Sequence, residues 1–320
     1  MTLVTKQDIE RAAAAIAGVA VRTPLIEAHW LSDRLGFEVR LKCENLQRAG
    51  SFKIRGAYNA IASLSAAERS RGVITYSSGN HGQAVALAAG LFGIKAVVVM
   101  PTTAPSIKVE GAKRLGAEVV LEGTTSTHRY DRAIALSQEH GYTVIPPFDD
   151  LRVIAGQGTI GLEILADLPA VRAVLFPVGG GGMLSGSSAY IKQTNPDVTT
   201  VGVEPAVADA MYQSIQAGQP VTIAAQPTIA DGLMPVRPGD LTYAHAAQYA
   251  DAMVRVSDAD IVGATRELIK HAKLIVEFSG AATVAALISG AFAPPSGPVV
   301  AVLSGGNLDP AKLTELLAQG

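Results

Sequence analysis

Short apolar runs alternate with helical periods along almost the whole chain, and this alternation most constrains the fold. The runs rich in Val, Ile and Leu lie at 73–76, 96–100, 118–121, 143–146, 173–177, 200–204 and 299–303. Helical periods lie at 1–18, 82–91, 105–115, 127–139, 154–166, 183–193, 258–271, 279–289 and 310–317. Continuous apolar strands are covered on both faces, and strands that alternate with helices form parallel βαβ units. The sequence therefore predicts an α/β fold.

Composition and charge exclude several classes of protein. The chain has 320 residues, 48% hydrophobic and 17% charged, which is enough to build two sub-domains. A net charge of -2 gives no support for a nucleic-acid or membrane partner, and no apolar run is long enough to span a bilayer. Charges at Lys6 and Asp8 interrupt any signal peptide. A single cysteine, Cys43, excludes an intramolecular disulfide, so we expect a cytoplasmic protein.

Polar, glycine-containing loops follow three of the expected strands directly. They lie at 77–82, 179–183 and 304–307. Ligands of open α/β sheets bind at the carboxyl ends of the strands. The three loops are therefore expected to converge on one cleft.

The second of these loops contains four consecutive glycines. Residues without Cβ leave their N–H groups free to surround an anion, and the helix expected from Met183 points its positive end at the same place. The loop, which predicts a phosphate site unless it is only a tight turn, comprises Gly179, Gly180, Gly181, Gly182 and Met183. The dinucleotide pattern G-x-G-x-x-G fails in every register, although Glu204 stands where a ribose-binding acid would lie.

Lys53 lies between a small capping residue, Ser51, and a helix-like run. Burial and the positive end of a helix both lower a lysine pKa and favour the neutral amine, which attacks carbonyl groups. A buried structural lysine or a surface lysine is the alternative. Together with a phosphate site and no nucleotide fingerprint, Lys53 suggests pyridoxal 5'-phosphate as cofactor.

Motifs along nearly the whole chain resemble those of fold-type II pyridoxal-phosphate enzymes in the serine/threonine dehydratase and serine racemase group. They lie at 42–47, 51–53, 77–82, 154–159, 179–183, 202–205, 228–232 and 304–307. Segments 146–161 and 237–243 look most like catabolic threonine ammonia-lyases without a regulatory domain. The resemblance implies two open twisted sheets of the tryptophan synthase β type.

The resemblance also implies roles for individual residues. Lys53 would form the Schiff base with the cofactor, and Phe52 would pack beside the cofactor ring. Asn80 would contact the 3'-oxygen of the cofactor, Ser304 would face the ring nitrogen, and residues 179–183 would hold the phosphate. The residues expected to receive the substrate carboxylate are Ser77, Ser78, Gly79, Asn80 and His81.

The reaction implied by the resemblance is β-elimination of L-threonine or L-serine to a 2-oxo acid and ammonia, with Lys53 as the base. Ser78 resembles the second base of the racemases, so serine racemase is an alternative, as is 3-hydroxyaspartate dehydratase. Outside this class, a dinucleotide-binding oxidoreductase and a ligand sensor that kept only the fold remain open. In each of these alternatives the partner would be a small molecule.

The family pattern further implies a small mobile domain at 66–147 and a large cofactor-binding domain at 1–65 and 148–320, assembled into a homodimer or homotetramer.

Racemase-like members bind a divalent cation through a Glu, a backbone carbonyl and an Asp. Glu204 and Ala208 match the first two positions, but Ala210 replaces the Asp. Because hard cations need six or more oxygen ligands, we expect no metal here.

Overall fold

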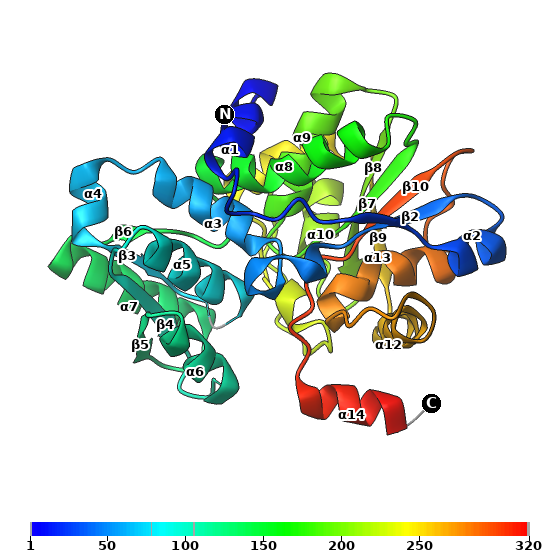
Figure 1. Cartoon of the computed structure of the whole chain (residues 1–320). Coiled ribbons are helices and arrows are strands. Elements are labelled where there is room, and N and C mark those ends of the chain that lie inside the picture. The colour runs from blue at the N-terminus through cyan, green and yellow to red at the C-terminus, as the bar shows by residue number, and fades with distance from the viewer. Residues whose placement is uncertain (1, 78, 105, 319–320) are drawn as a thin grey trace.

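Two open β-sheets with helices on both faces make up the protein (Figure 1). The computed structural model describes residues 2–77, 79–104 and 106–318. Within that part of the chain, a six-stranded sheet has the order β1-β2-β10-β7-β8-β9, and a four-stranded sheet has the order β5-β4-β3-β6. The predicted α/β fold with two sheets is confirmed.

The six-stranded sheet has the last strand of the chain near its centre. Its strands are β1 (Leu25–Glu27), β2 (Val39–Lys42), β7 (Ala173–Pro177), β8 (Thr199–Pro205), β9 (Ala252–Val256) and β10 (Val299–Val302). All pairs are parallel except β1 with β2. Strand β10 lies between β2 and β7, so the loop that follows it opens at the middle of the sheet edge.

Both faces of this sheet are buried. Leu175 of β7 belongs to a core cluster with α12 (Asp258–Glu267) and α13 (Phe278–Ile288). Its neighbour Phe176 belongs to a second cluster with α8 (Leu151–Asp167) and α9 (Gly182–Thr194). Successive side chains of a strand point to opposite faces, so burial on both sides explains the continuous apolar run.

The four-stranded sheet is parallel throughout. Its strands are β3 (Val73–Thr75), β4 (Ala96–Met100), β5 (Glu118–Leu121) and β6 (Thr143–Val144). Helices α3 (Lys53–Ala62) and α5 (Asn80–Leu91) pack on the face that carries Val98, and α7 (Ser126–His140) packs on the face that carries Val97. Helices α4 (Ala66–Arg71) and α6 (Ser106–Arg114) belong to the same half of the chain.

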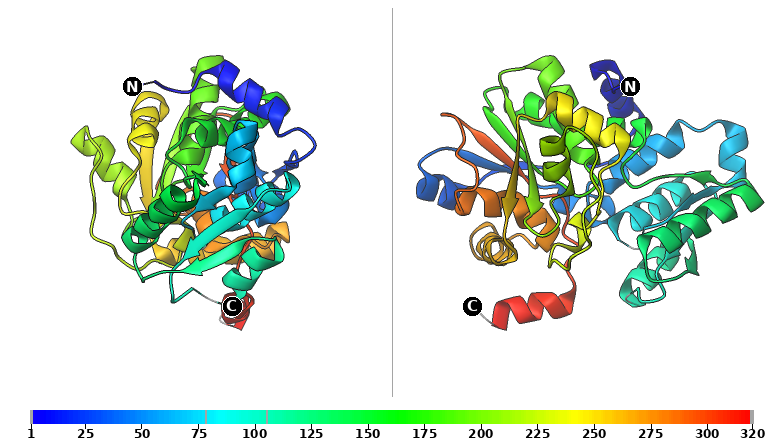
Figure 2. Two further views of the ribbon diagram at one scale, coloured as in Figure 1. Left: turned by 90° about the vertical axis from the view of Figure 1, so that its left-hand side faces the viewer. Right: turned by 180° about the vertical axis from the view of Figure 1, so that it is seen from behind.

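We propose that residues 66–147 form the small domain. All four strands of the second sheet fall within this range, and Figure 2 shows this half, coloured cyan to green, beside the larger half. Helix α3 belongs to the expected large domain in sequence but packs against α5 of the smaller half. It is therefore the element that joins the two.

Every strand expected from the sequence is present to within two residues at each end. Residue 105, the first of the expected helix 105–115, lies outside the described residues. Elements that the sequence analysis did not identify include β1, β2, β9, α2 (His29–Leu35), α4, α10 (Ala210–Ala217) and α11 (Asp240–Tyr249). The remaining elements are α1 (Lys6–Ala15), α14 (Pro310–Ala318), η1 (Glu44–Leu46), η2 (Arg48–Gly50), η3 (Asp231–Leu233) and a π-helical turn, η4 (Leu268–Ala272).

None of the helices described could cross a bilayer, because none is both long and apolar enough.

A buried cluster of charges fixes the first turn of α3. The guanidinium of Arg55 donates to Glu44 at 2.7 and 2.8 Å and to Glu163 at 2.7 and 2.9 Å. The Lys42 amine donates to Glu163 and, at 2.7 Å, to the carbonyl of Thr23. Two cations and two carboxylates thus balance one another. Because Lys42 is the last residue of β2 and shares Glu163 with Arg55, the cluster anchors α3 to the large sheet.

We expect Arg55→Met to destabilise the protein by about 3–5 kcal/mol, because it leaves buried carboxylates without their main partner. The free energy of unfolding in urea measures this loss. Arg34→Met is the matched control. Its partner Glu267 is 3.8 Å away and its side chain is 50% exposed, so the loss should stay below about 1 kcal/mol. Equal losses for the two variants would contradict the role given to the cluster.

Candidate active site

Lys53 is the first residue of α3, and its partly buried amine has few polar neighbours. The Nζ atom donates to the carbonyl of Pro147 at 2.8 Å and lies 5.0 Å from the centroid of the Phe52 ring. Burial lowers the pKa of Lys53 to about 8, and the nearby Glu277 carboxylate opposes the shift only in part. The amine is therefore far easier to deprotonate than a surface lysine.

Backbone pairing brings Ser304 to the start of α3. The Phe52 N–H donates to the carbonyl of Ser304 at 3.1 Å, and Ser51 forms an antiparallel bridge with Gly305. Ser304 follows β10 and is buried. The loop after the central strand and the lysine therefore lie together, as expected for loops at the carboxyl ends of strands.

The glycine loop joins β7 to the N-terminus of α9. Gly181 is the N-cap of α9 and has a φ of 92°, a conformation that favours glycine. A Cβ atom on Gly180 would come within 2.1 Å of the Phe148 ring, which therefore lies directly on the loop. Pro147 contacts the Lys53 amine, so the adjacent residues Pro147 and Phe148 connect the lysine to the loop.

The loop after β3 provides the side of the site that belongs to the four-stranded sheet. Ser78 lies outside the described residues. Asn80 is the first residue of α5, after Gly79 at the N-cap, and its amide donates to Glu277 at 2.7 Å. His81 is buried, and its Nε2 lies 3.0 Å from the carbonyl of Ile145. Burial lowers the pKa of His81 to about 3, so the ring is neutral.

Two residues at the site were not predicted from the sequence. Phe148 covers the glycine loop, and Glu277 is a buried carboxylate beside Asn80. Glu277 follows the apolar residues 274–276 and precedes Phe278, so a charged residue inside an apolar run was the available signal.

The acidic residues at the cation position suggested by the family pattern bind backbone N–H groups and an arginine here. Both oxygens of Glu204 accept backbone N–H groups at the start of α10, from Met211 at 2.9 Å and Tyr212 at 2.8 Å. Asp209 pairs with Arg255 at 3.1 Å. Among the residues described, no three His, Cys, Asp or Glu side chains are placed to hold a metal ion. That the protein needs no metal stays a prediction.

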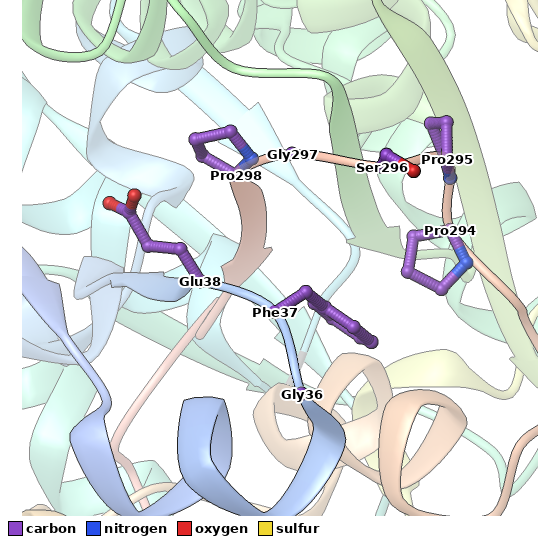
Figure 3. A pocket seen from close by; sticks show the side chains of 8 residues that line it. All are labelled: Gly36, Phe37, Glu38, Pro294, Pro295, Ser296, Gly297 and Pro298. Carbon is purple, nitrogen blue, oxygen red and sulfur yellow. The ribbon is translucent and has the colours of Figure 1, made fainter.

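A surface pocket lies at the other end of the six-stranded sheet (Figure 3). It is lined by residues 36–38, which precede β2, and by residues 294–298, which precede β10. It therefore opens at the amino ends of these strands, whereas Lys53 and Ser304 lie at the carboxyl ends. This pocket is not part of the candidate active site.

Comparison with known proteins identifies the family. The family model for pyridoxal-phosphate dependent enzymes matches residues 16–305. The chain belongs to this family.

Several relatives are similar over nearly the whole chain. An L-threonine ammonia-lyase from Thermotoga maritima is 44% identical over 99% of this chain and 79% of its own length. The catabolic L-threonine dehydratase of Escherichia coli is 40% identical over 97% of this chain and 94% of its own. The solved structure of maize serine racemase superposes with a TM-score of 0.95 at 36% identity, covering 99% of this chain and 98% of that one.

The residues present suit pyridoxal phosphate. The loop at 179–183 places glycine backbone and the start of α9 where an anion would be stabilised, and its residues before Met183 carry no side chains of their own. The Lys53 amine contacts Pro147, which is adjacent to the Phe148 that lies on this loop. His81 Nδ1 and Ser51 Oγ are buried polar atoms without a hydrogen-bond partner among the described residues. Such unsatisfied atoms are typical of a site that receives a polar ligand.

We expect Gly180→Ala to weaken pyridoxal phosphate binding by about tenfold or more, because the added methyl group displaces the Phe148 ring and crowds the loop. Equilibrium dialysis of the unloaded protein measures the dissociation constant. Gly263→Ala in α12 is the control, since its new Cβ would meet nothing within 4 Å. Unchanged affinity in Gly180→Ala would show that the loop does not hold the cofactor.

Proposed function

We propose that this enzyme eliminates the β-hydroxyl group of L-threonine or L-serine, giving a 2-oxo acid and ammonia. One observation carries the proposal: a lysine amine with a lowered pKa contacts Pro147, whose neighbour Phe148 lies on the glycine loop. The buried Glu277, which bonds to Asn80, is close enough to this amine to oppose the shift. The similarity to threonine ammonia-lyases over 99% of the chain supports the same reaction. Segment 77–81 would bind the substrate carboxylate through backbone N–H and hydroxyl groups.

The cofactor would be held by residues from both halves of the chain. Backbone N–H groups of residues 179–183 would bind its phosphate, and the Asn80 amide would bind its 3'-oxygen. Ser304 would face the ring nitrogen. A hydroxyl cannot keep that nitrogen protonated as a carboxylate would, which favours prompt loss of a β leaving group over a long-lived carbanion.

Pyridoxal phosphate, when bound, supplies the electron-withdrawing ring that acidifies the substrate α-carbon. Lys53 would act as the general base. Its amine would take the proton from the α-carbon, and the ammonium group so formed would give a proton to the departing hydroxyl group, which leaves the β-carbon as water. Because burial keeps the pKa of Lys53 near 8, the amine can be neutral before the transfer and protonated after it.

Closure of the cleft would protect this chemistry. The small domain at 66–147 carries segment 77–81, so its movement toward the large domain would bring the carboxylate site to Lys53 and exclude water. Assembly into a homodimer or homotetramer and a cytoplasmic location also stay predictions.

We expect Lys53→Ala to lower the rate of 2-oxo acid release from L-threonine by roughly 100-fold or more, because it removes the amine that would move the α-proton. A coupled assay for the keto acid measures the rate. Lys113→Ala removes a lysine whose side chain is 53% exposed and should leave the rate unchanged. A wild-type protein that binds pyridoxal phosphate but releases no keto acid from L-threonine or L-serine would contradict the proposed reaction.

A racemase activity would depend on Ser78. The similarity to maize serine racemase makes this second activity worth testing. If Ser78 is the base on the opposite face of the α-carbon, Ser78→Ala should abolish inversion of L-serine and spare elimination. Chiral chromatography and the keto-acid assay measure the two rates on one sample. Equal loss of both would rule out the second base.

A further inference from the structure

Glu277 lies where the two halves of the chain meet. It directly precedes α13 of the large sheet, is only 8% exposed, and accepts a hydrogen bond from the Asn80 amide of α5 at 2.7 Å. A Cβ atom on Gly305 would lie 2.4 Å from the Glu277 carboxylate, so this carboxylate packs directly on the loop that follows β10. The position is therefore in the candidate site itself.

The Asn80 amide is held at both ends. Its NH2 group donates to Glu277, and its oxygen accepts from the Asn307 amide at 2.8 Å. Asn307 in turn donates to the carbonyl of Ala49 at 2.9 Å. An unrestrained side-chain amide can rotate to exchange its donor and acceptor ends. Here Glu277 accepts from the NH2 end and Asn307 donates to the oxygen end, so these two partners determine the orientation of the amide.

Burial of Glu277 is unfavourable by itself. Burial raises the pKa of Glu277 to about 7, and the Asp231 carboxylate adds to the shift, while the Asn80 hydrogen bond, Lys108 and Lys53 oppose it. These charged groups come from η3, α6 and α3. Lys108 and Asp231 form an ion pair at 2.8 Å that spans the same junction. A buried carboxylate with so few donors calls for an explanation other than stability.

We propose that Glu277 is a positioning residue that acts through Asn80. By orienting the Asn80 amide, it fixes the start of α5, with Asn80 and His81, against the large domain. The inference deepens the proposed function, because the positioned segment is the expected carboxylate site. Glu277 itself need not touch the substrate.

A double-mutant cycle tests whether Glu277 acts through Asn80. Glu277→Ala and Asn80→Ala should each lower kcat by on the order of 10-fold to 100-fold and weaken pyridoxal phosphate binding. The double variant should lose no more than the worse single variant, because both changes remove the same bond. Effects that multiply in the double variant would overturn the proposal, as would unchanged kinetics in Glu277→Ala.

Glu277→Gln separates positioning from charge. Its amide oxygen can still accept from Asn80, so pyridoxal phosphate affinity should return to within about threefold of wild type. If Glu277→Gln binds the cofactor as poorly as Glu277→Ala, the positioning role is wrong. Cofactor binding is measured without turnover, so this arm remains decisive even if the protein proves inactive on hydroxy amino acids.

Thermal unfolding of the unloaded protein provides a readout that no catalytic step affects. The pKa of Glu277 is raised from 4.5 to about 7, so its contribution to stability is present below pH 4.5 and is lost as the pH rises through 7. The melting temperature of wild type should therefore fall relative to Glu277→Gln over this range, by several degrees. Parallel pH profiles for the two proteins would show that the carboxylate is not buried at this junction and would overturn the proposal.

Discussion

Backbone pairing between residues 50–52 and 304–306 holds the candidate site together. The Phe52 N–H donates to Ser304, and the Gly306 N–H donates to Gly50 at 2.8 Å. The Glu277 N–H donates to Gly305 at 3.0 Å in the same loop. These bonds attach the start of α3 to the end of β10, the central strand of the large sheet. The position of the Lys53 amine therefore depends on a strand that is buried throughout.

Most of the strands that could be predicted are buried on both faces. Strand β7 reads Ala-Val-Leu-Phe-Pro, and every residue in it is buried. Strand β2 reads Val-Arg-Leu-Lys, and its alternating charged residues interrupt the apolar run that would identify a buried strand. Lys42 is nevertheless fully buried, since Glu163 from a distant helix neutralises it. Strand β9 lies at the sheet edge with Arg255 exposed, so its sequence also lacks the signal of a core strand.

The candidate site likewise contains residues that could be recognised from the sequence and residues that could not. The glycine loop and Lys53 could be recognised because their signals are local: residues without Cβ before a helix, and a lysine at a helix start. Glu277 could not be recognised, because its partner Asn80 is 197 positions earlier in the chain. Phe148 likewise acquires its place only when Gly180 packs against it. Long-range contacts of this kind leave no periodic pattern in a sequence.

The central claim is that the Lys53 amine bonds covalently to pyridoxal phosphate. The most direct measurement is reduction of the loaded protein with borohydride, followed by proteolysis and mass spectrometry of the peptides. The account predicts that the peptide containing Lys53 carries the pyridoxyl phosphate mass and that the other lysines remain unmodified. A loaded, reduced protein with an unmodified Lys53, or with the label on another lysine, would contradict it.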